Sequence, residues 1–445
     1  MNKSYKRYWS MSEIRKVETN MELLEKVLSK ENLNKAYKQV YKNKGASGVD
    51  GVTVEELFAY IKEHKEEILW QIRNRKYKPQ PVRRVYIPKE NGKLRKLGIP
   101  SVIDRVIQQA IVQVLTPIYE EQFSNNSFGF RPNRSCEMAV IKVLECFNDG
   151  YDWVVDIDLQ SFFDEVNQDK LIGIIRRTIK DGNLVSLIRK FLQSGVMEKG
   201  VIQESKKGTP QGGNLSPLLS NIMLNELDKE LEKRGLNFVR YADDCLIMVK
   251  SEKAANRVME SITTFITKKL GLIVNVEKSK VARPNQIKYL GFGFYKKINQ
   301  NIWRPKPHIK SVNKFKTKLR DILVRGRSVS LDERLLKLKQ LIYGWVNYFR
   351  IADMKILMRQ IDENIRRKLR VIIWKQWKKI KKRYTSLRKL GILHRDAYVT
   401  ANSRRGYYHI AHTRVLESAI SKERLNKRGL VNSLDHYLKV HIITN

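Results

Sequence analysis

Residues 153–159, WVVDIDL, have the apolar content of a buried β-strand but carry two acids, Asp156 and Asp158. A carboxylate in a buried strand is costly unless it is paired with a cation or bound to a metal. Strand side chains alternate between the two faces of a sheet, so Asp156 and Asp158 share one face. The segment therefore predicts a strand that presents carboxylates to a cation.

A second pair of acids follows in the chain. Residues 238–241 and 246–249 read as two short strands, and the turn between them contains Asp243 and Asp244. An Asp-Asp turn alone is ordinarily just solvated. Carboxylate oxygens are, however, the ligands that suit Mg²⁺, and nucleotidyl transfer uses two such cations.

The segments around these acids have recognisable local patterns. Residues 77–100 alternate like an extended hairpin with Asn91-Gly92 at its turn and basic residues in both arms. After GTPQGGNLSP (208–217), a helix is expected with Ser216 as its cap, Pro217 in first position and Gly235 after its end. Further helices are expected within residues 1–75, with a polar break at 43–51, and at 103–119 and 136–148.

The charge of the chain points to a polyanionic partner. Lys and Arg number 87 against 46 Asp and Glu, a net charge of +41. Residues 301–445 hold 36 basic and 10 acidic residues, or +26 of that total. Four tryptophans and regular apolar spacing in this stretch indicate a folded, mostly helical and basic region rather than a solvated tail. A linker is expected near 295–310, where Pro305 and Pro307 occur.

Other function classes are disfavoured. The three cysteines form no CxxC pair, which argues against a disulfide framework or a cysteine-rich zinc site. No apolar run approaches membrane-spanning length, and no apolar segment follows the basic start. We expect a cytoplasmic protein without a membrane partner.

Taken in order, the acid-bearing strand, the PQGG loop and the YADD turn resemble the motif series of reverse transcriptases. NKGASGVDG (43–51), SFGFRPNRS (127–135), GTPQGGNLSPLLSNI and FVRYADD narrow the resemblance to group II intron-encoded proteins. LIYGWVNYFRIAD (341–353) resembles their maturase-specific helical domain. The resemblance covers nearly the whole chain.

This resemblance implies an α+β fold of the right-hand polymerase type, with fingers, a palm built on an antiparallel sheet, a helical thumb, and a small basic α-rich C-terminal domain. The expected divisions are an N-terminal extension and the start of the fingers at 1–75, fingers at 76–150, palm at 151–300, thumb or maturase-specific domain at 301–365, and basic nucleic-acid-binding domain at 366–445.

The resemblance also assigns the metal ligands. Asp158, Asp243 and Asp244 would hold two Mg²⁺ ions, for which Mn²⁺ can substitute. Asp158 stands five residues before Phe163, the family's spacing between the first aspartate and the aromatic residue that excludes a ribose 2′-hydroxyl. Asp156 is the alternative first ligand, because it lies on the same face of the strand.

Further residues are assigned to nucleotide and template by the same resemblance. Lys89 and Arg95 would contact the triphosphate of the incoming dNTP, and Gln211 would face the nascent base pair. Arg131 either helps to shape this pocket or has a purely structural role. Gly212, Tyr241 and Gly291, the last in YLGFGF (289–294), would lie along template and primer.

The implied function is RNA-directed DNA polymerase and maturase: the protein would bind its group II intron RNA, promote splicing, and copy the RNA into cDNA from a DNA primer during retrohoming. His409 and His412 have no accompanying Cys pairs, so we expect no second-strand nuclease, as in the compact bacterial group IIC proteins that ANSRRGYYHIAHTRVL (401–416) resembles. The number of subunits stays open.

Two rival functions remain. One is a reverse transcriptase recruited to a host task such as phage defence, which would not need the maturase-specific domain. The other is an RNA-binding splicing cofactor with a vestigial polymerase, against which the intact acids and Phe163 argue.

Overall fold

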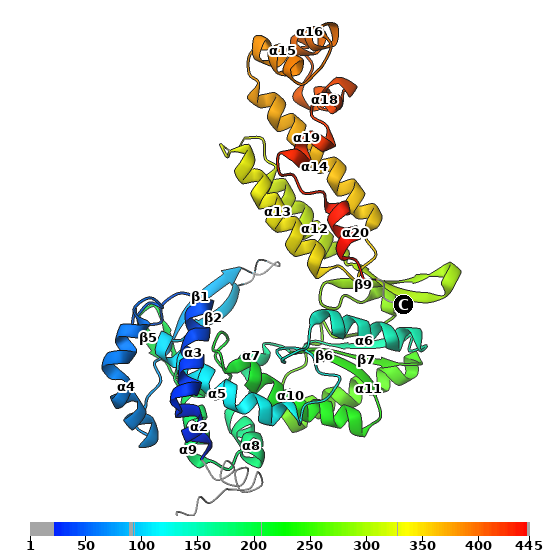
Figure 1. Ribbon diagram of the computed structural model, residues 1–445. Helices are drawn as coiled ribbons and strands as arrows, with labels where there is room; N and C mark the ends of the chain where they lie inside the picture. The colour runs from blue at the N-terminus through cyan, green and yellow to red at the C-terminus, as the bar shows by residue number, and fades with distance from the viewer. Residues whose placement is uncertain (1–21, 89–91, 93, 206, 327, 443–445) are drawn as a thin grey trace, which may run out of the picture. The chain divides into compact units, whose positions relative to one another are not determined.

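The computed structural model describes residues 22–88, 92, 94–205, 207–326 and 328–442 (Figure 1). The chain divides into two compact units. The first comprises Met1–Ala139 and Tyr151–Ala282, and the second Val140–Gly150 and Arg283–Asn445. The division cuts through α6 (Cys136–Asn148), a helix expected from the sequence. No helix within the described ranges is long and apolar enough to cross a membrane.

The first unit begins with helices, as expected. α2 (Leu23–Leu28) and α3 (Lys30–Asn43) pack on α5 (Val102–Glu120), and a polar segment separates α3 from α4 (Leu57–Arg73). Ser101 caps α5 by accepting a hydrogen bond from the Asp104 N–H. These helices place the two strands that precede α5.

Those strands form the predicted basic hairpin. β1 (Val82–Pro88) and β2 (Leu94–Ile99) pair antiparallel from Arg83 opposite Ile99 to Pro88 opposite Leu94. Of the expected turn, Asn91 lies outside the described residues, and Gly92 has a φ of 77°. A second, unpredicted hairpin of β4 (Val196–Glu198) and β5 (Val201–Gln203) extends the sheet in the order β2-β1-β4-β5.

The acid-bearing strand lies inside a second sheet, which is antiparallel throughout and has the order β6-β7-β3-β8. Its strands are β3 (Trp153–Ile157), β6 (Asn237–Tyr241), β7 (Asp244–Val249) and β8 (Lys280–Ala282). α11 (Glu252–Phe265) packs against β3 and β7. The palm-like antiparallel sheet with helices packed on it is confirmed.

Three short helices follow β3 and shape the core of the first unit: α7 (Phe162–Glu165), α8 (Gln168–Thr178) and α9 (Gly182–Leu192). α10 (Ser216–Lys233) then contributes most of its apolar side chains to the same core. The predicted cap of α10 is wrong. Leu215 occupies the N-cap position, and the Ser216 hydroxyl instead donates to the Pro210 carbonyl at 2.7 Å, which ties the helix to the preceding loop.

In the second unit, the linker expected near 295–310 is wrong. β9 (Phe292–Lys297) and β10 (Ile302–Pro307) form an antiparallel hairpin there, with Pro305 opposite Phe294 and Pro307 opposite Phe292. Proline lacks an N–H, so it is tolerated in a strand that pairs on one side only. The prolines that suggested a linker lie in such an edge strand.

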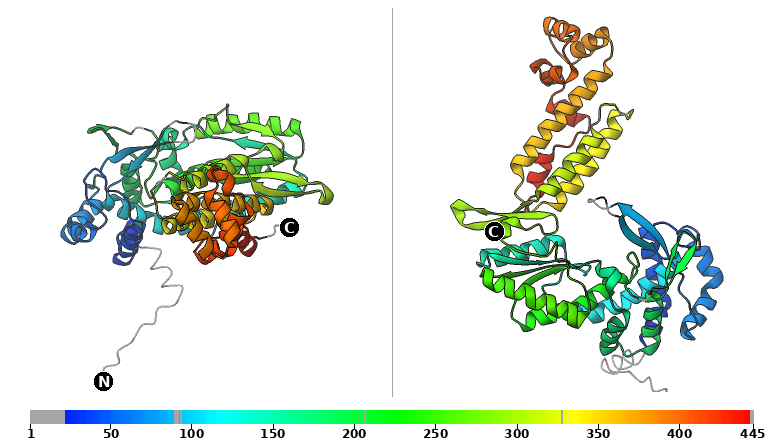
Figure 2. Two further views of the ribbon diagram at one scale, coloured as in Figure 1. Left: turned by 90° about the horizontal axis from the view of Figure 1, so that it is seen from above. Right: turned by 180° about the vertical axis from the view of Figure 1, so that it is seen from behind.

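Helices make up the rest of the second unit. α12 (Ile309–Ile322), α13 (Leu331–Tyr348), α14 (Lys355–Gln376) and α20 (Ser433–Val440) run side by side (Figure 1 and the right-hand view of Figure 2). The Phe315 and Trp345 rings stack between them at 4.4 Å. The Asp362 carboxylate of α14 accepts the N–H groups of Ser433 and Leu434, which fixes the start of α20.

The remaining helices follow α14 along the chain: α15 (Ile380–Lys389), α16 (His394–Asn402), α17 (Tyr407–Ile410), α18 (Arg414–Ala419) and α19 (Lys422–Lys427). Trp374, at 1% exposure, lies in the interior of this region. The folded, helical and basic C-terminal region is therefore present. Residues 365 and 366, where we expected a domain boundary, lie within the continuous helix α14.

Candidate active site

The β3–β7 pairing brings the expected acids to one end of the sheet. Ile157 pairs with Cys245, so Asp158, which follows Ile157, and Asp243 and Asp244, which precede Cys245, lie at the same edge. Asp156 pairs with Leu246 and is thus one step further into the sheet. The local sequence forces this arrangement, because two apolar strands pair in register and their polar ends meet.

The backbone of Asp158 is fixed by the turn before β8. Its N–H donates to the Ser279 hydroxyl at 3.0 Å, and its carbonyl accepts the Asn275 N–H at 2.8 Å. The Lys278 ammonium lies 3.3 Å from both carboxylate oxygens of Asp158. Asp158 is therefore a half-buried carboxylate already turned toward a cation.

The pKa of Asp243 is affected by burial and by the nearby Asp158 carboxylate. Burial raises the pKa of Asp243 above its ordinary value and the Asp158 carboxylate raises it further, while Arg95 and Arg240 act in the opposite direction. Burial likewise raises the pKa of Asp156 to about 6, with Lys280 opposing it. Mutual repulsion between Asp158 and Asp243 is the condition that a divalent cation between them would relieve.

A buried ion pair between Arg240 and Asp228 fixes the Ala242-Asp243 turn. Arg240, with no exposed surface, donates from Nε and Nη2 to the two Asp228 oxygens at 2.7 and 2.5 Å. Its Nη1 donates to the Asn221 amide oxygen and to the Ala242 carbonyl. The guanidinium thus fixes the peptide immediately before Asp243.

The SFGF loop (residues 127–130) also contacts the Ala242-Asp243 turn. Ala242 has a φ of 57°, and a Cβ placed on Gly129 would lie only 2.2 Å from the Ala242 nitrogen. The Asn221 amide donates to the Gly129 carbonyl at 2.8 Å. The Phe128 N–H donates to the Arg240 carbonyl at 2.8 Å, and the Arg240 N–H donates to the Asn126 carbonyl at 2.9 Å. Glycine is needed at 129 because the two backbones are in contact.

Phe163 and Gln211 line one cavity of about 230 Å³, together with Arg84 of β1. Phe163 packs edge-on against the buried Phe162 at 5.3 Å. The loop carrying Gln211 is fixed to Phe163, because the Thr209 N–H donates to the Phe163 carbonyl at 2.7 Å. The Gln211 carbonyl accepts the Gly98 N–H at 2.7 Å, so the loop also joins the basic hairpin.

Gly212 lies in the same contact. Its φ is 122°, and a Cβ there would meet the Gly98 carbonyl oxygen at 2.3 Å. The structure therefore places Gln211 and Gly212 against Gly98 of β2, while Thr209 of the same loop joins it to Phe163.

The three basic residues assigned to the nucleotide pocket have different surroundings. Arg95 is exposed on β2, and it is near enough to Asp243 to lower the pKa of that carboxyl. Lys89 lies outside the described residues. Arg131 is buried and donates to the Glu120 carboxylate and to the Ser124 and Ser127 carbonyls, which favours its structural role.

The remaining two predicted residues lie in different units. Tyr241 ends β6 opposite Asp244, and burial and a hydrogen bond with Cys136 raise its pKa to about 12. Gly291 belongs to the second unit, where it has a φ of 83° in the turn that joins Tyr289 and Phe292. A Cβ on Gly291 would press on the Ser311 hydroxyl and the Phe349 ring.

The donor chemistry of the acids fits magnesium. Asp158 and Asp243 offer hard carboxylate oxygens, and Mg²⁺ in nucleotide sites is commonly held by one or two carboxylates plus substrate phosphates. Within the described ranges, no three His, Cys, Asp or Glu side chains converge as a complete metal cage. Asp158, Asp243 and Asp244 therefore do not form such a three-carboxylate group, and their role as magnesium ligands stays a prediction.

Sequence reasoning missed the residues that hold the acids in place. Arg240, its partner Asp228, and Lys278 with Ser279 were not singled out. A signal for Arg240 existed: an arginine inside the otherwise apolar strand FVRY should have demanded a buried partner. No sequence signal identified Asp228 as that partner.

Two family models match this chain. Residues 87–294 match "Reverse transcriptase (RNA-dependent DNA polymerase)", and residues 312–391 match "Group II intron, maturase-specific domain". The first match contains the acids, Phe163 and Gln211. The second covers α12 to α15.

Several known proteins are similar in sequence. Protein YkfC of Escherichia coli (strain K12) is 34% identical over 303 residues, which are 59% of this chain and 80% of YkfC. Group II intron-encoded protein LtrA of Lactococcus lactis subsp. cremoris is 34% identical over 323 residues, 58% of this chain and 54% of LtrA. The putative COX1/OXI3 intron 2 protein of Saccharomyces cerevisiae is 27% identical over 337 residues, 61% of this chain and 38% of that protein. The chain thus spans about half the length of LtrA.

Proposed function

Since this chain belongs to the group II intron-encoded reverse transcriptases with a maturase-specific domain, we propose that it copies RNA into DNA at Asp158 and Asp243 and assists the splicing of its intron RNA. The observation that carries the polymerase assignment is the meeting of these two carboxylates at the edge of the sheet. In the same unit, Phe163 and Gln211 share a cavity.

Asp158, Asp243 and the exposed Asp244 would hold the magnesium ions. Bound there, these ions supply activation of the primer hydroxyl and stabilisation of the pyrophosphate leaving group. The burial of the three side chains supports Asp158 and Asp243 as the main ligands and Asp244 as the weaker one. Asp158 and Asp243 are partly buried, whereas Asp244 is exposed and opens β7.

The chain's own residues position the substrates. Phe163, fixed by its contacts with Phe162 and Thr209, fills the space that a ribose 2′-hydroxyl would need, and so favours dNTPs. Arg95, with Lys89, would hold the triphosphate through charge-assisted hydrogen bonds. Gln211, on a loop fixed at both ends, would face the nascent base pair. Gly212 and Tyr241, with Gly291 of the second unit, would border template and primer.

The maturase assignment is carried by the second unit. Its maturase-specific region, residues 312–391, lies in the part of the chain that holds +26 of the net charge. A helical surface of this charge suits the phosphates of a folded RNA, which is recognised largely by shape. We propose group II intron RNA as the partner, with a DNA primer at the target. We also propose that the chain comprises an N-terminal extension, fingers, a palm, a thumb and a basic domain, the last two joined through the continuous helix α14.

Primer extension by the purified full chain tests the polymerase assignment. With an annealed RNA template, dNTPs and Mg²⁺, we expect cDNA that disappears when the metal is chelated. The Asp243→Asn variant should lose extension while its affinity for RNA at fixed salt stays near wild type. An equal loss of both properties would show that the acid is structural. Splicing of the RNA that flanks the gene, with and without protein, tests the maturase assignment separately.

A further inference from the structure

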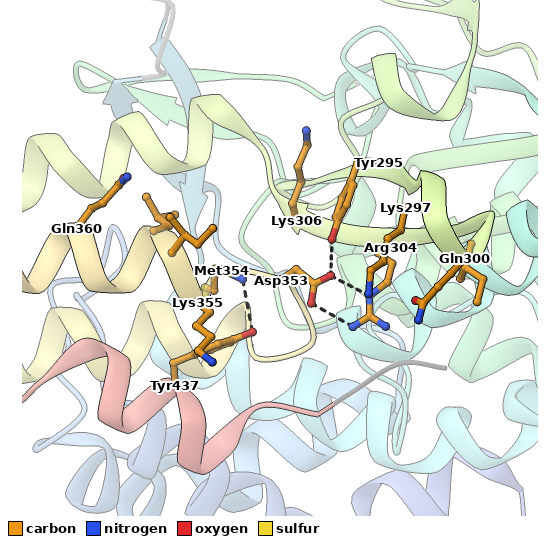
Figure 3. A pocket seen from close by; sticks show the side chains of 13 residues that line it. Tyr295, Lys297, Gln300, Arg304, Lys306, Asp353, Met354, Lys355, Gln360 and Tyr437 are labelled. Carbon is orange, nitrogen blue, oxygen red and sulfur yellow. Dashed lines mark hydrogen bonds and ion pairs between the residues drawn. The ribbon is translucent and has the colours of Figure 1, made fainter.

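A large cavity in the second unit lies apart from the residues discussed so far. It has a volume of about 1310 Å³ and lies between the β9–β10 hairpin, the start of α14 and the Tyr437 side chain of α20 (Figure 3). Small-molecule sites usually measure roughly 300–1,000 Å³. The space therefore suits a segment of a polymer better than a small metabolite.

The single acid in this cavity is already neutralised. Asp353 accepts hydrogen bonds from Arg304 at 2.8 and 3.1 Å and from the Tyr295 hydroxyl at 2.6 Å. Although burial acts to raise it, these bonds hold the pKa of Asp353 below its ordinary value. The Tyr437 side chain also lines the cavity, and its hydroxyl donates to the Ala352 carbonyl. A cation is not expected to bind here.

Positive charge remains in excess around this cavity. Lys297 and Lys306 project from the hairpin and Lys355 from α14, in addition to the paired Arg304 (Figure 3). The first turn of α14 carries no acid, and its N-terminus has no side-chain cap. A helix N-terminus and three ammonium groups both attract anions, and phosphate above all.

Apolar and amide groups lie between the lysines. Ile302 and Leu357 are half-buried, and Ile356 is 71% exposed beside the cavity. Gln300 and Gln360 add amide groups, which can donate to and accept from base edges. A duplex would bring mainly phosphates to this surface, whereas an unpaired strand also brings base faces and edges.

We propose that this cavity binds an unpaired segment of RNA, with phosphates on Lys297, Lys306 and Lys355 and bases against Ile356 and the two glutamines. The choice of RNA over DNA rests on the proposed function, because α14 begins within the maturase-specific match. An acidic protein segment would find the same lysines, but it would not need the exposed apolar groups.

Site-specific crosslinking on the full chain tests the proposal. The photoreactive residue p-benzoylphenylalanine replaces Gln360, or, as the matched control, Gln376, which is exposed on the same helix but does not line the cavity. The probes are an unstructured RNA oligonucleotide, the same sequence as DNA, and the RNA annealed to its complement. The readout is the fraction of bound probe that is captured.

We expect p-benzoylphenylalanine in place of Gln360 to capture at least about fivefold more of the unpaired RNA than the same residue in place of Gln376. Changing Lys297, Lys306 and Lys355 together to Gln should lower that capture about tenfold or more. The same change at the exposed Lys233, Lys253 and Lys268 of the first unit removes equal charge away from the cavity and should leave the captured fraction within about twofold.

Each other result has a definite meaning. Equal capture of the unpaired RNA at positions 360 and 376 would overturn the cavity as a binding site. Capture of the RNA duplex equal to that of the unpaired RNA would overturn the preference for an unpaired strand. Capture of the DNA equal to that of the RNA would overturn the preference for RNA. Primer extension, measured in parallel, separates this inference from the proposed function. Extension without capture at Gln360 refutes only the cavity assignment, and capture without extension by the wild-type chain refutes only the polymerase.

Discussion

Arg240 and Asp228 form a bidentate ion pair at 2.5 and 2.7 Å, and neither side chain has exposed surface. Arg240 also donates to the Ala242 carbonyl, so the pair joins α10 to the turn that carries Asp243. A buried pair of this kind has a modest net effect on stability, but removing one partner leaves an uncompensated charge.

We therefore expect Arg240→Met to lower the free energy of unfolding by about 3–5 kcal/mol. Combining it with Asp228→Leu should restore much of that loss, since an apolar pair can replace a buried ion pair. The double variant still lacks the hydrogen bond to Ala242, so its rate of primer extension should stay low. Urea unfolding and extension rates measure the two effects. Full recovery of both would limit the pair to a structural role.

Gly129 offers a test of the contact beside this turn. In Gly129→Ala, the new Cβ would overlap the Ala242 backbone, and displacement of Asp243 should slow extension about tenfold or more, since an error of about 1 Å can cost a hundredfold. Gly173→Ala is the matched control, because this glycine of α8 has no atom within 4 Å of an added Cβ. The control should extend at the wild-type rate. Equal rates in both variants would mean that the SFGF loop does not position the turn.

Phe163 should determine the choice of sugar. Phe163→Ala opens the cavity that it shares with Gln211, and we expect the preference for dCTP over CTP, measured as a ratio of kcat/KM values, to fall about tenfold or more. Phe191→Leu trims a buried ring of α9 that does not line that cavity, and should keep the preference. An unchanged ratio in Phe163→Ala would assign sugar selection elsewhere.

Asp104 predicts a pH dependence of stability. It is buried and accepts from the Tyr77 and Ser101 hydroxyls and the Gln80 N–H, and burial raises its pKa from 3.8 to about 6. The folded state then binds the proton more tightly than the unfolded state. The associated stability is present below pH 4 and is lost as pH rises through about 6.

The measurement compares unfolding of the wild type and Asp104→Asn across this range. The free energy of unfolding of the wild type, relative to the variant, should fall by up to about 3 kcal/mol between pH 4 and 7. Parallel pH profiles would mean that the pKa of Asp104 is not raised in the folded chain.

Local patterns explain what the sequence could predict. The apolar strand around Asp156, the hairpin carrying Asp243, and the Asn91-Gly92 hairpin each depend on residues close in the chain, and the antiparallel sheet follows from pairing them. Phe163 and Gln211 were placed by resemblance; they line one cavity, and their roles in nucleotide binding stay predictions.

What could not be predicted depends on partners distant in sequence. Asp228 meets Arg240 only because α10 packs beneath β6, and Lys278 meets Asp158 from a turn 120 residues away. The strands β4 and β5 have three residues each, too few for a period-two pattern. Pro305 and Pro307 suggested a linker because proline usually interrupts strands, whereas here they lie in an edge strand.

The central claim is that Asp158, rather than Asp156, is paired with Asp243 in catalysis. Single-turnover primer extension on an RNA template with Mg²⁺ compares Asp158→Asn with Asp156→Asn, two isosteric changes two residues apart on one face. We predict that Asp158→Asn lowers the rate at least about a hundredfold, whereas Asp156→Asn stays within about tenfold of wild type. Loss of extension in Asp156→Asn, with Asp158→Asn active, would contradict the claim.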